Sequence, residues 1–186
     1  MSDVLQDAPV DACVAFGGNV GAVQENLRLA IAGVAALPHT RLLRVSSLYR
    51  TAPVGVEDQP EFVNGALVLA TCLPAGALLR ALLGIERTLG RTREVRWGPR
   101  TVDLDLILFG DVTLDEPDLV LPHPRMHERG FVLVPLAEVA GERRHPVRGL
   151  SVAELLRELG PTPDVELLNR PNWADTLQAG EETEWA

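Results

Sequence analysis

The sequence contains no lysine, and all 17 of its basic residues are arginine. A Walker-type phosphate loop, a Schiff-base enzyme and a kinase with a phosphate-pairing lysine all need a lysine side chain. The absence excludes these three classes, and any phosphate chemistry of this chain must use arginine.

Cysteine and long apolar runs are also scarce. Cys13 and Cys72 lie in apolar segments without ligand-like neighbours, which favours free thiols over a disulfide or a metal site. No apolar segment approaches the roughly 18 residues typical of a membrane span, and the acidic start does not resemble a signal peptide. The formal net charge of −9 argues against nucleic acid or an anionic membrane as partner. We expect a cytoplasmic monomer that binds small molecules.

The length of 186 residues, with 46% hydrophobic and 23% charged residues, is typical of one compact domain with a short extra segment. We expect residues 1–160 to form this domain. Residues 161–186 are predicted to be an acidic, proline-containing tail that is partly disordered.

Periodicity and turn signals predict the order β-α-β-β-α-β for the first part of the chain. The strands are expected at residues 10–16, 42–51, 62–71 and 101–109, and the helices at 24–37 and 74–89. Two further helices are expected at 130–139 and 152–159. The order β-α-β-β-α-β is that of a ferredoxin-like fold, so the predicted class is α+β.

The strongest local signal for chemistry is Asp103-Leu104-Asp105. Side chains two residues apart in a strand share a face, so both carboxylates are expected to point the same way. Two neighbouring carboxylates suit Mg²⁺, which binds one or two of them together with substrate phosphates. The alternative is a strand with a solvated charged face.

An arginine-rich loop directly precedes this strand. Arg91, Arg93, Arg96 and Arg100 lie within ten residues, with Trp97 among them. Arginine forks bind phosphate oxygens, and cations beside a carboxylate pair are what phosphoryl transfer requires. The alternative is a solvated loop whose arginines pair with surface acids.

Other candidates lie outside this region. His123 and Arg129 are possible phosphate donors, although a surface role would equally explain His123. Asn64 lies in a predicted strand, where an amide is disfavoured unless its polar atoms are used. Phe62 and Phe131 have ordinary core packing as their alternative.

The run RWGPRTVDLDLILFG, residues 96–110, closely resembles the signature of the 6-hydroxymethyl-7,8-dihydropterin pyrophosphokinase family of folate biosynthesis. Residues 49–51 (YRT), 58–64 (DQPEFVN), 122–123 (PH) and 129–131 (RGF) resemble its other motifs in the same order. The resemblance covers roughly residues 10–160 and implies a ferredoxin-like αβα sandwich. The chain departs from the family pattern at Gly18, where serine is usual, and at Pro124, where tyrosine is common.

The resemblance implies an ATP-dependent diphosphotransferase that moves pyrophosphate from MgATP to the hydroxymethyl group of the pterin and releases AMP. It implies that Arg91 and Arg100 are catalytic and that Asp103 and Asp105 hold two Mg²⁺ ions. The residues implied to bind ATP are Glu86, Arg93, Trp97, Arg100, His123 and Arg129. Those implied to bind the pterin are Thr51, Val54, Phe62, Asn64, Asp103 and Phe131.

Two other functions stay open at the level of sequence. A different Mg²⁺-dependent phosphotransferase or phosphohydrolase would use the same acidic pair and arginines, but it would leave Phe62 and Phe131 unexplained. A noncatalytic binding module of the same fold would be expected to have lost the acidic pair or the arginines, and both are present.

Overall fold

The computed structural model describes residues 5–53, 59–90 and 98–169 of the chain. The ferredoxin-like part consists of β1 (Val10–Gly18), α1 (Val23–Ala35), β2 (Thr40–Val45), β3 (Leu48–Thr51), β4 (Phe62–Thr71), α2 (Ala75–Thr88) and β5 (Asp103–Phe109). After it come β6 (Leu114–Glu116), β7 (Leu119–Leu121), a 3₁₀ turn η1 (Met126–Glu128), α3 (Gly130–Ala140), α4 (Val152–Leu159) and β8 (Val165–Asn169). The Leu121–Pro122 peptide bond is cis.

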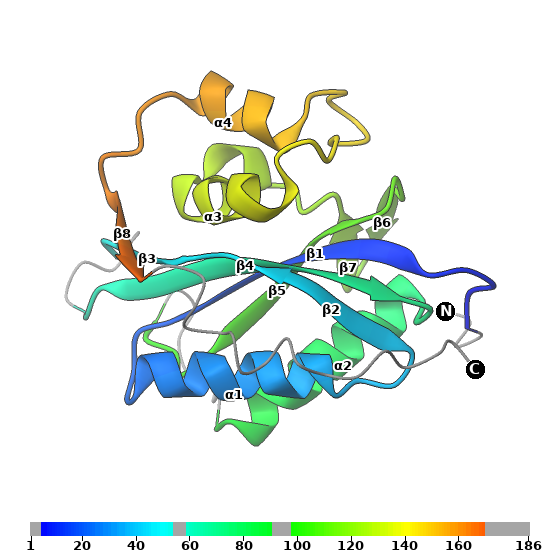
Figure 1. Ribbon diagram of the computed structural model, residues 1–186, viewed down its shortest axis with the longest axis horizontal. Helices are drawn as coiled ribbons and strands as arrows, with labels where there is room; N and C mark the ends of the chain where they lie inside the picture. The colour runs from blue at the N-terminus through cyan, green and yellow to red at the C-terminus, as the bar shows by residue number, and fades with distance from the viewer. Residues whose placement is uncertain (1–4, 54–58, 91–97, 170–186) are drawn as a thin grey trace.

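The main sheet has the strand order β5-β1-β4-β3-β8. Strand β2 pairs with residues 67–71 of β4, and β3 pairs with residues 62–64 of the same strand. Every pairing in the sheet is antiparallel. Figure 1 shows α1 and α2 on one face of this sheet and α3 and α4 on the other. The predicted α+β class and αβα sandwich are confirmed.

Strand β4 is the centre of both hydrophobic layers. Leu67 and Leu69 pack with the side chains of α1 and α2, whereas Ala66 and Val68 pack with those of α3 and α4. Because successive side chains of a strand point to opposite faces, a strand covered on both sides is apolar throughout. This explains the nearly continuous apolar run at residues 62–71, where the predicted strand boundaries are confirmed.

The single strand predicted at residues 42–51 is wrong, because the chain forms β2 and β3 with a break at Ser46 and Ser47. The hydroxyl of Ser46 accepts from the Ala66 amide at 2.9 Å, and both the amide and the hydroxyl of Ser47 donate to the carboxylate of Glu138 at 2.9 Å. The Tyr49 hydroxyl donates to the same carboxylate at 2.9 Å. One residue of α3, Glu138, therefore holds the start of β3 through contacts that a local pattern does not reveal.

Strand β8 was not expected, because it lies in the segment interpreted as a tail. Residues Val165–Asn169 pair with β3 and form an edge of the main sheet. The side chains of Thr162 and Val165 pack against Gly130 at the start of α3. The part of the tail that the structure describes thus contacts both the sheet and the helix above it (Figure 1).

Both cysteines are free thiols, as predicted, with Cys13 buried and Cys72 half-buried. Burial raises the pKa of the Cys13 thiol to about 12, so this thiol is protonated and inert at neutral pH. In the described ranges, no helix combines the length and the apolar character that crossing a membrane would require.

Candidate active site

A pocket of about 390 Å³ lies at one end of the sheet. The antiparallel topology brings together the end of β1 at Gly17, the end of β3 at Thr51, the start of β4 at Phe62 and the start of β5 at Asp103. The first turn of α3, at Gly130 to Val132, closes the pocket from above the sheet. Backbone N–H groups at the start of a helix favour an anion.

Nine of the residues singled out in the sequence line this pocket together. They are Thr51, Phe62, Asn64, Arg100, Asp103, Asp105, His123, Arg129 and Phe131. Val54, Arg91, Arg93 and Trp97 lie outside the described residues, so their roles stay predictions.

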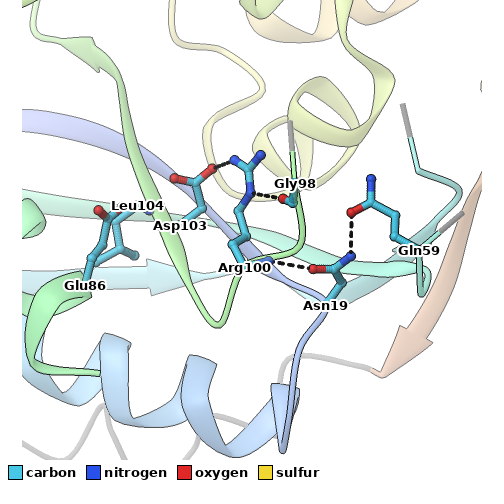
Figure 2. A network of polar contacts seen from close by, with 7 residues as sticks. All are labelled: Asn19, Gln59, Glu86, Gly98, Arg100, Asp103 and Leu104. Carbon is cyan, nitrogen blue, oxygen red and sulfur yellow. Dashed lines mark hydrogen bonds and ion pairs between the residues drawn. The ribbon is translucent and has the colours of Figure 1, made fainter. Parts of the chain in front are cut away.

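The acidic pair lies at the start of β5, on the pocket side of the strand. Asp103 and Asp105 line the pocket, while Leu104 between them is buried in the core between the sheet and helices α1 and α2. The predicted shared face of the two carboxylates is therefore confirmed. Asp103 forms an ion pair with Arg100, whose side chain is 23% exposed (Figure 2).

The donor set of this pair fits a magnesium ion. In the described part of the chain, no cluster of three or more His, Cys, Asp or Glu side chains is arranged to hold a metal. Two carboxylates without a third protein ligand suit Mg²⁺, because this ion keeps several waters and takes further oxygens from substrate phosphates. Zinc and calcium sites usually have more protein ligands.

Two arginines lie over the two aromatic rings of the pocket. The guanidinium carbon of Arg100 is 5.8 Å from the ring centre of Phe62, and that of Arg129 is 5.5 Å from the ring centre of Phe131. Burial and the neighbouring Arg125 lower the pKa of Arg129, although arginine keeps its charge in proteins. Flat apolar surfaces and fixed positive charge therefore lie side by side, as a ligand with an aromatic ring and phosphates would require.

His123 is neutral at pH 7 and has a defined tautomer. Burial is the main cause that lowers the pKa of His123 to about 4, and the charge of Arg129 lowers it further. The Nδ1 atom accepts a hydrogen bond from the Arg125 amide at 3.2 Å. The proton of the neutral ring therefore lies on Nε2, which can donate to an anion.

A buried hydrogen bond to Thr51 orients the side chain of Asn64. Its Nδ2 donates to the hydroxyl of Thr51 at 2.7 Å, and both residues are less than 10% exposed. A Cβ at Gly17 would collide with the Oδ1 of Asn64, so glycine leaves the space that this amide needs. The need for glycine here was not predicted, because it depends on a neighbouring strand.

Asn19 was also missed, and it links two segments beside the pocket. Its Oδ1 accepts from the Arg100 amide at 2.9 Å, and its Nδ2 donates to Oε1 of Gln59 at 3.2 Å (Figure 2). The same Nδ2 also donates to the Pro60 carbonyl at 3.0 Å. Asn19 is only 3% exposed. The sequence signal that could have identified Asn19 is its position directly after Gly17 and Gly18 at the end of β1.

Glu86 has a different environment from the other candidates. It is 2% exposed, it is absent from the described lining of the pocket, and its Oε1 accepts from the Leu104 amide at 2.7 Å. A contact between Glu86 and ATP stays a prediction. Arg125, Glu128 and Asp164 also line the pocket, although no role was predicted for them.

Comparisons with known proteins identify relatives over most of the chain. The family model described as 7,8-dihydro-6-hydroxymethylpterin-pyrophosphokinase (HPPK) matches residues 13–141. The 2-amino-4-hydroxy-6-hydroxymethyldihydropteridine pyrophosphokinase of Pseudomonas aeruginosa is 48% identical over 143 residues, which are 77% of this chain and 88% of the relative. The protein of the same name from Synechocystis sp. is 44% identical over 151 residues, which are 81% of this chain and 77% of the relative.

Solved structures show the same fold. The Plasmodium falciparum HPPK-DHPS wild type with pteroate superposes with a TM-score of 0.66 at 16% sequence identity. The match covers 85% of this chain and 43% of that chain. This chain therefore spans less than half of the Plasmodium protein, and the likeness concerns the fold of the shared part.

Proposed function

The chain belongs to the 7,8-dihydro-6-hydroxymethylpterin-pyrophosphokinase family, and we propose that it transfers pyrophosphate from ATP to 6-hydroxymethyl-7,8-dihydropterin in folate biosynthesis. The observation that carries this proposal is the pocket in which the acidic pair, arginines and two phenyl rings meet. In the reaction, the hydroxymethyl oxygen of the pterin forms a bond to the β-phosphorus of ATP. The bond between the β-phosphorus and the bridging α–β oxygen breaks, the hydroxyl proton is lost, and AMP leaves.

The two aromatic rings and the buried amide form the pterin side of the pocket. Phe62 and Phe131 offer flat apolar surfaces to the pterin ring, and base–aromatic stacking of this kind typically contributes about 1–3 kcal/mol. Asn64, held by Thr51, offers the oriented polar group that recognises the edge of the ring. We assign Val54 to the same side on the strength of the family motif.

The positively charged residues form the phosphate side. Arg129 and the Nε2–H of His123 hold ATP phosphates, and Arg100 stabilises the negative charge that develops in the transition state. Asp103 and Asp105 would hold two Mg²⁺ ions, which neutralise phosphate charge when bound. Arg91 as a catalytic residue, and Arg93 and Trp97 as ATP contacts, complete the proposal.

Positioning supplies most of the rate enhancement in this scheme, because phosphoryl transfer requires little covalent chemistry from the protein. Arg100 is well placed for this role. It pairs with Asp103, lies over Phe62 and donates its backbone amide to Oδ1 of Asn19, so one residue connects the acidic pair to the pterin side. We further propose that the protein works in the cytoplasm, which is consistent with its free thiols. We also propose that it is a monomer, which sedimentation equilibrium would test.

The test is AMP release from MgATP with and without 6-hydroxymethyl-7,8-dihydropterin. We expect wild type to release AMP only with the pterin and Asp103→Ala/Asp105→Ala to lose at least about 10³-fold in kcat, since the metal would lose both protein ligands. Asp115→Ala, which removes an exposed carboxylate from β6, is the matched control and should keep full activity. ADP formed regardless of pterin would indicate the alternative phosphohydrolase, and absence of turnover would contradict the proposal.

A further inference from the structure

Glu86 is a charged residue in an unusual place. It lies near the end of α2, it is 2% exposed, and its carboxylate accepts from the Leu104 amide of β5 (Figure 2). Acidic side chains are rarely buried to this degree, because removing a carboxylate from water is costly unless it is paired. The position therefore needs a reason.

The edge of the sheet supplies one. In the described chain, β5 is the last strand of the main sheet and pairs only with β1. Successive N–H groups of a strand point to alternate edges, so the Leu104 amide, which bonds Glu86, points away from β1. A buried amide without a partner costs as much as a lost hydrogen bond. The carboxylate of Glu86 takes the place that a further strand would occupy.

Leu104 lies between the two residues of the acidic pair. Its amide belongs to the peptide unit that follows Asp103, and its carbonyl belongs to the unit that precedes Asp105. A shift of β5 at this point moves the backbone of both aspartates. It also disturbs the ion pair between Asp103 and Arg100.

We propose that Glu86 is a positioning residue for the acidic pair. Its hydrogen bond to the Leu104 amide holds the start of β5, and this fixes the relative placement of Asp103 and Asp105 that the divalent cation and the ATP phosphates require. The consequence for metal binding rests on the proposed function. The hydrogen bond itself does not.

Two conservative substitutions separate the bond from the charge. Glu86→Gln keeps an Oε1 acceptor at the same distance along the side chain and removes the charge. Glu86→Asp keeps the charge but shortens the side chain by one methylene, which withdraws the acceptor from Leu104. A positioning residue tolerates Gln and is impaired by Asp, whereas a residue that acts through its charge shows the reverse.

The first measurement is amide hydrogen exchange of the full chain by NMR, which needs no ligand. We expect the Leu104 amide to exchange at least about 10-fold faster in Glu86→Asp than in wild type, and within about twofold of wild type in Glu86→Gln. The amides of Leu67 and Leu69 in the central strand β4 report global opening. An unchanged Leu104 amide in Glu86→Asp, or equal acceleration at all three amides, would overturn the proposal.

The second measurement is the Mg²⁺ concentration that gives half-maximal pterin-dependent AMP release. It should rise about 10-fold in Glu86→Asp and less than about twofold in Glu86→Gln, with an unchanged KM for the pterin. A metal requirement unchanged in Glu86→Asp would overturn the link to the acidic pair. If wild type released no AMP, the proposed function would fail, while the exchange experiment would still judge the role of Glu86.

Discussion

At the scale of single residues, the pocket depends on side chains whose chemistry is changed by burial. His123 is neutral because burial and Arg129 lower its pKa to about 4, and its Nδ1 is occupied by the Arg125 amide. In the free protein its Nε2–H is therefore available as a neutral hydrogen-bond donor, and the proposed function assigns this donor to an ATP phosphate.

The proposed function assigns the two phenyl rings of the pocket to the pterin. Replacing Phe62 or Phe131 by leucine keeps an apolar side chain but removes the flat face, so each variant should bind 6-hydroxymethyl-7,8-dihydropterin about 5- to 100-fold more weakly. Titration calorimetry with the pterin measures this loss. The affinity for ATP in the absence of pterin is the internal control and should change less than about twofold. Unchanged pterin affinity in both variants would show that the rings serve only the packing of the core.

At the scale of elements, the site is built where strands and helices end. Thr51 ends β3, Phe62 begins β4 and Asp103 begins β5, so small changes at strand ends move the pocket directly. The contact of β1 with the segment before β5 is especially close. A Cβ at Gly18 would lie 2.5 Å from the carbonyl oxygen of Thr101.

Two glycine substitutions test this closeness. Gly18→Ala should destabilise the protein by about 1–3 kcal/mol, because the neighbouring atom is backbone and cannot turn aside. Gly84→Ala in α2 should stabilise it by about 0.5–1 kcal/mol, because a Cβ there meets nothing within 4 Å and alanine favours the helix. Urea unfolding measures both changes. Equal stability of Gly18→Ala and wild type would mean that the Thr101 backbone gives way freely.

At the scale of the whole molecule, the buried His145 and the half-buried His123 link stability to pH. Burial lowers the pKa of His145, with the neighbouring His127 and Arg148 as further causes, and the pKa of His123 falls from 6.5 to about 4. Below pH 6.5 these two imidazoles become protonated in the unfolded chain, whereas in the folded protein they stay neutral to lower pH. Their contribution to the free energy of unfolding is therefore complete above pH 6.5 and decreases below it, and the part that comes from His123 is lost as the pH falls toward 4.

Urea unfolding between pH 4.5 and 7.5 checks this dependence. We expect the free energy of unfolding of wild type to decrease as the pH decreases, and that of His145→Asn to decrease less steeply. Asparagine is chosen because its amide oxygen can still accept from the Val147 and Arg148 amides. The matched control is His39→Asn, because His39 is exposed and its left-handed backbone (φ 55°) is one that asparagine tolerates. If the unfolding free energy of His145→Asn changed with pH as steeply as that of wild type, His145 would not be a source of the pH dependence.

Local sequence patterns determined much of this protein by themselves. Side-chain periodicity predicted the helices of the fold, the boundaries of β4 and α4, and the shared face of Asp103 and Asp105. These features depend on neighbours two to four residues away, so a single stretch of chain contains the information. The absence of lysine and the motif at residues 96–110 likewise predict arginine-based phosphate chemistry.

The tertiary structure alone decided the features that depend on distant contacts. Glu138 of α3 meets the break at Ser47, β8 joins β3, and Glu86 reaches the Leu104 amide across 18 positions of the chain. The neutral state of His123 likewise follows from burial against Arg129. The physical reason is that burial and edge pairing are set by which segments pack together, and no local pattern encodes the partner that satisfies a buried polar group.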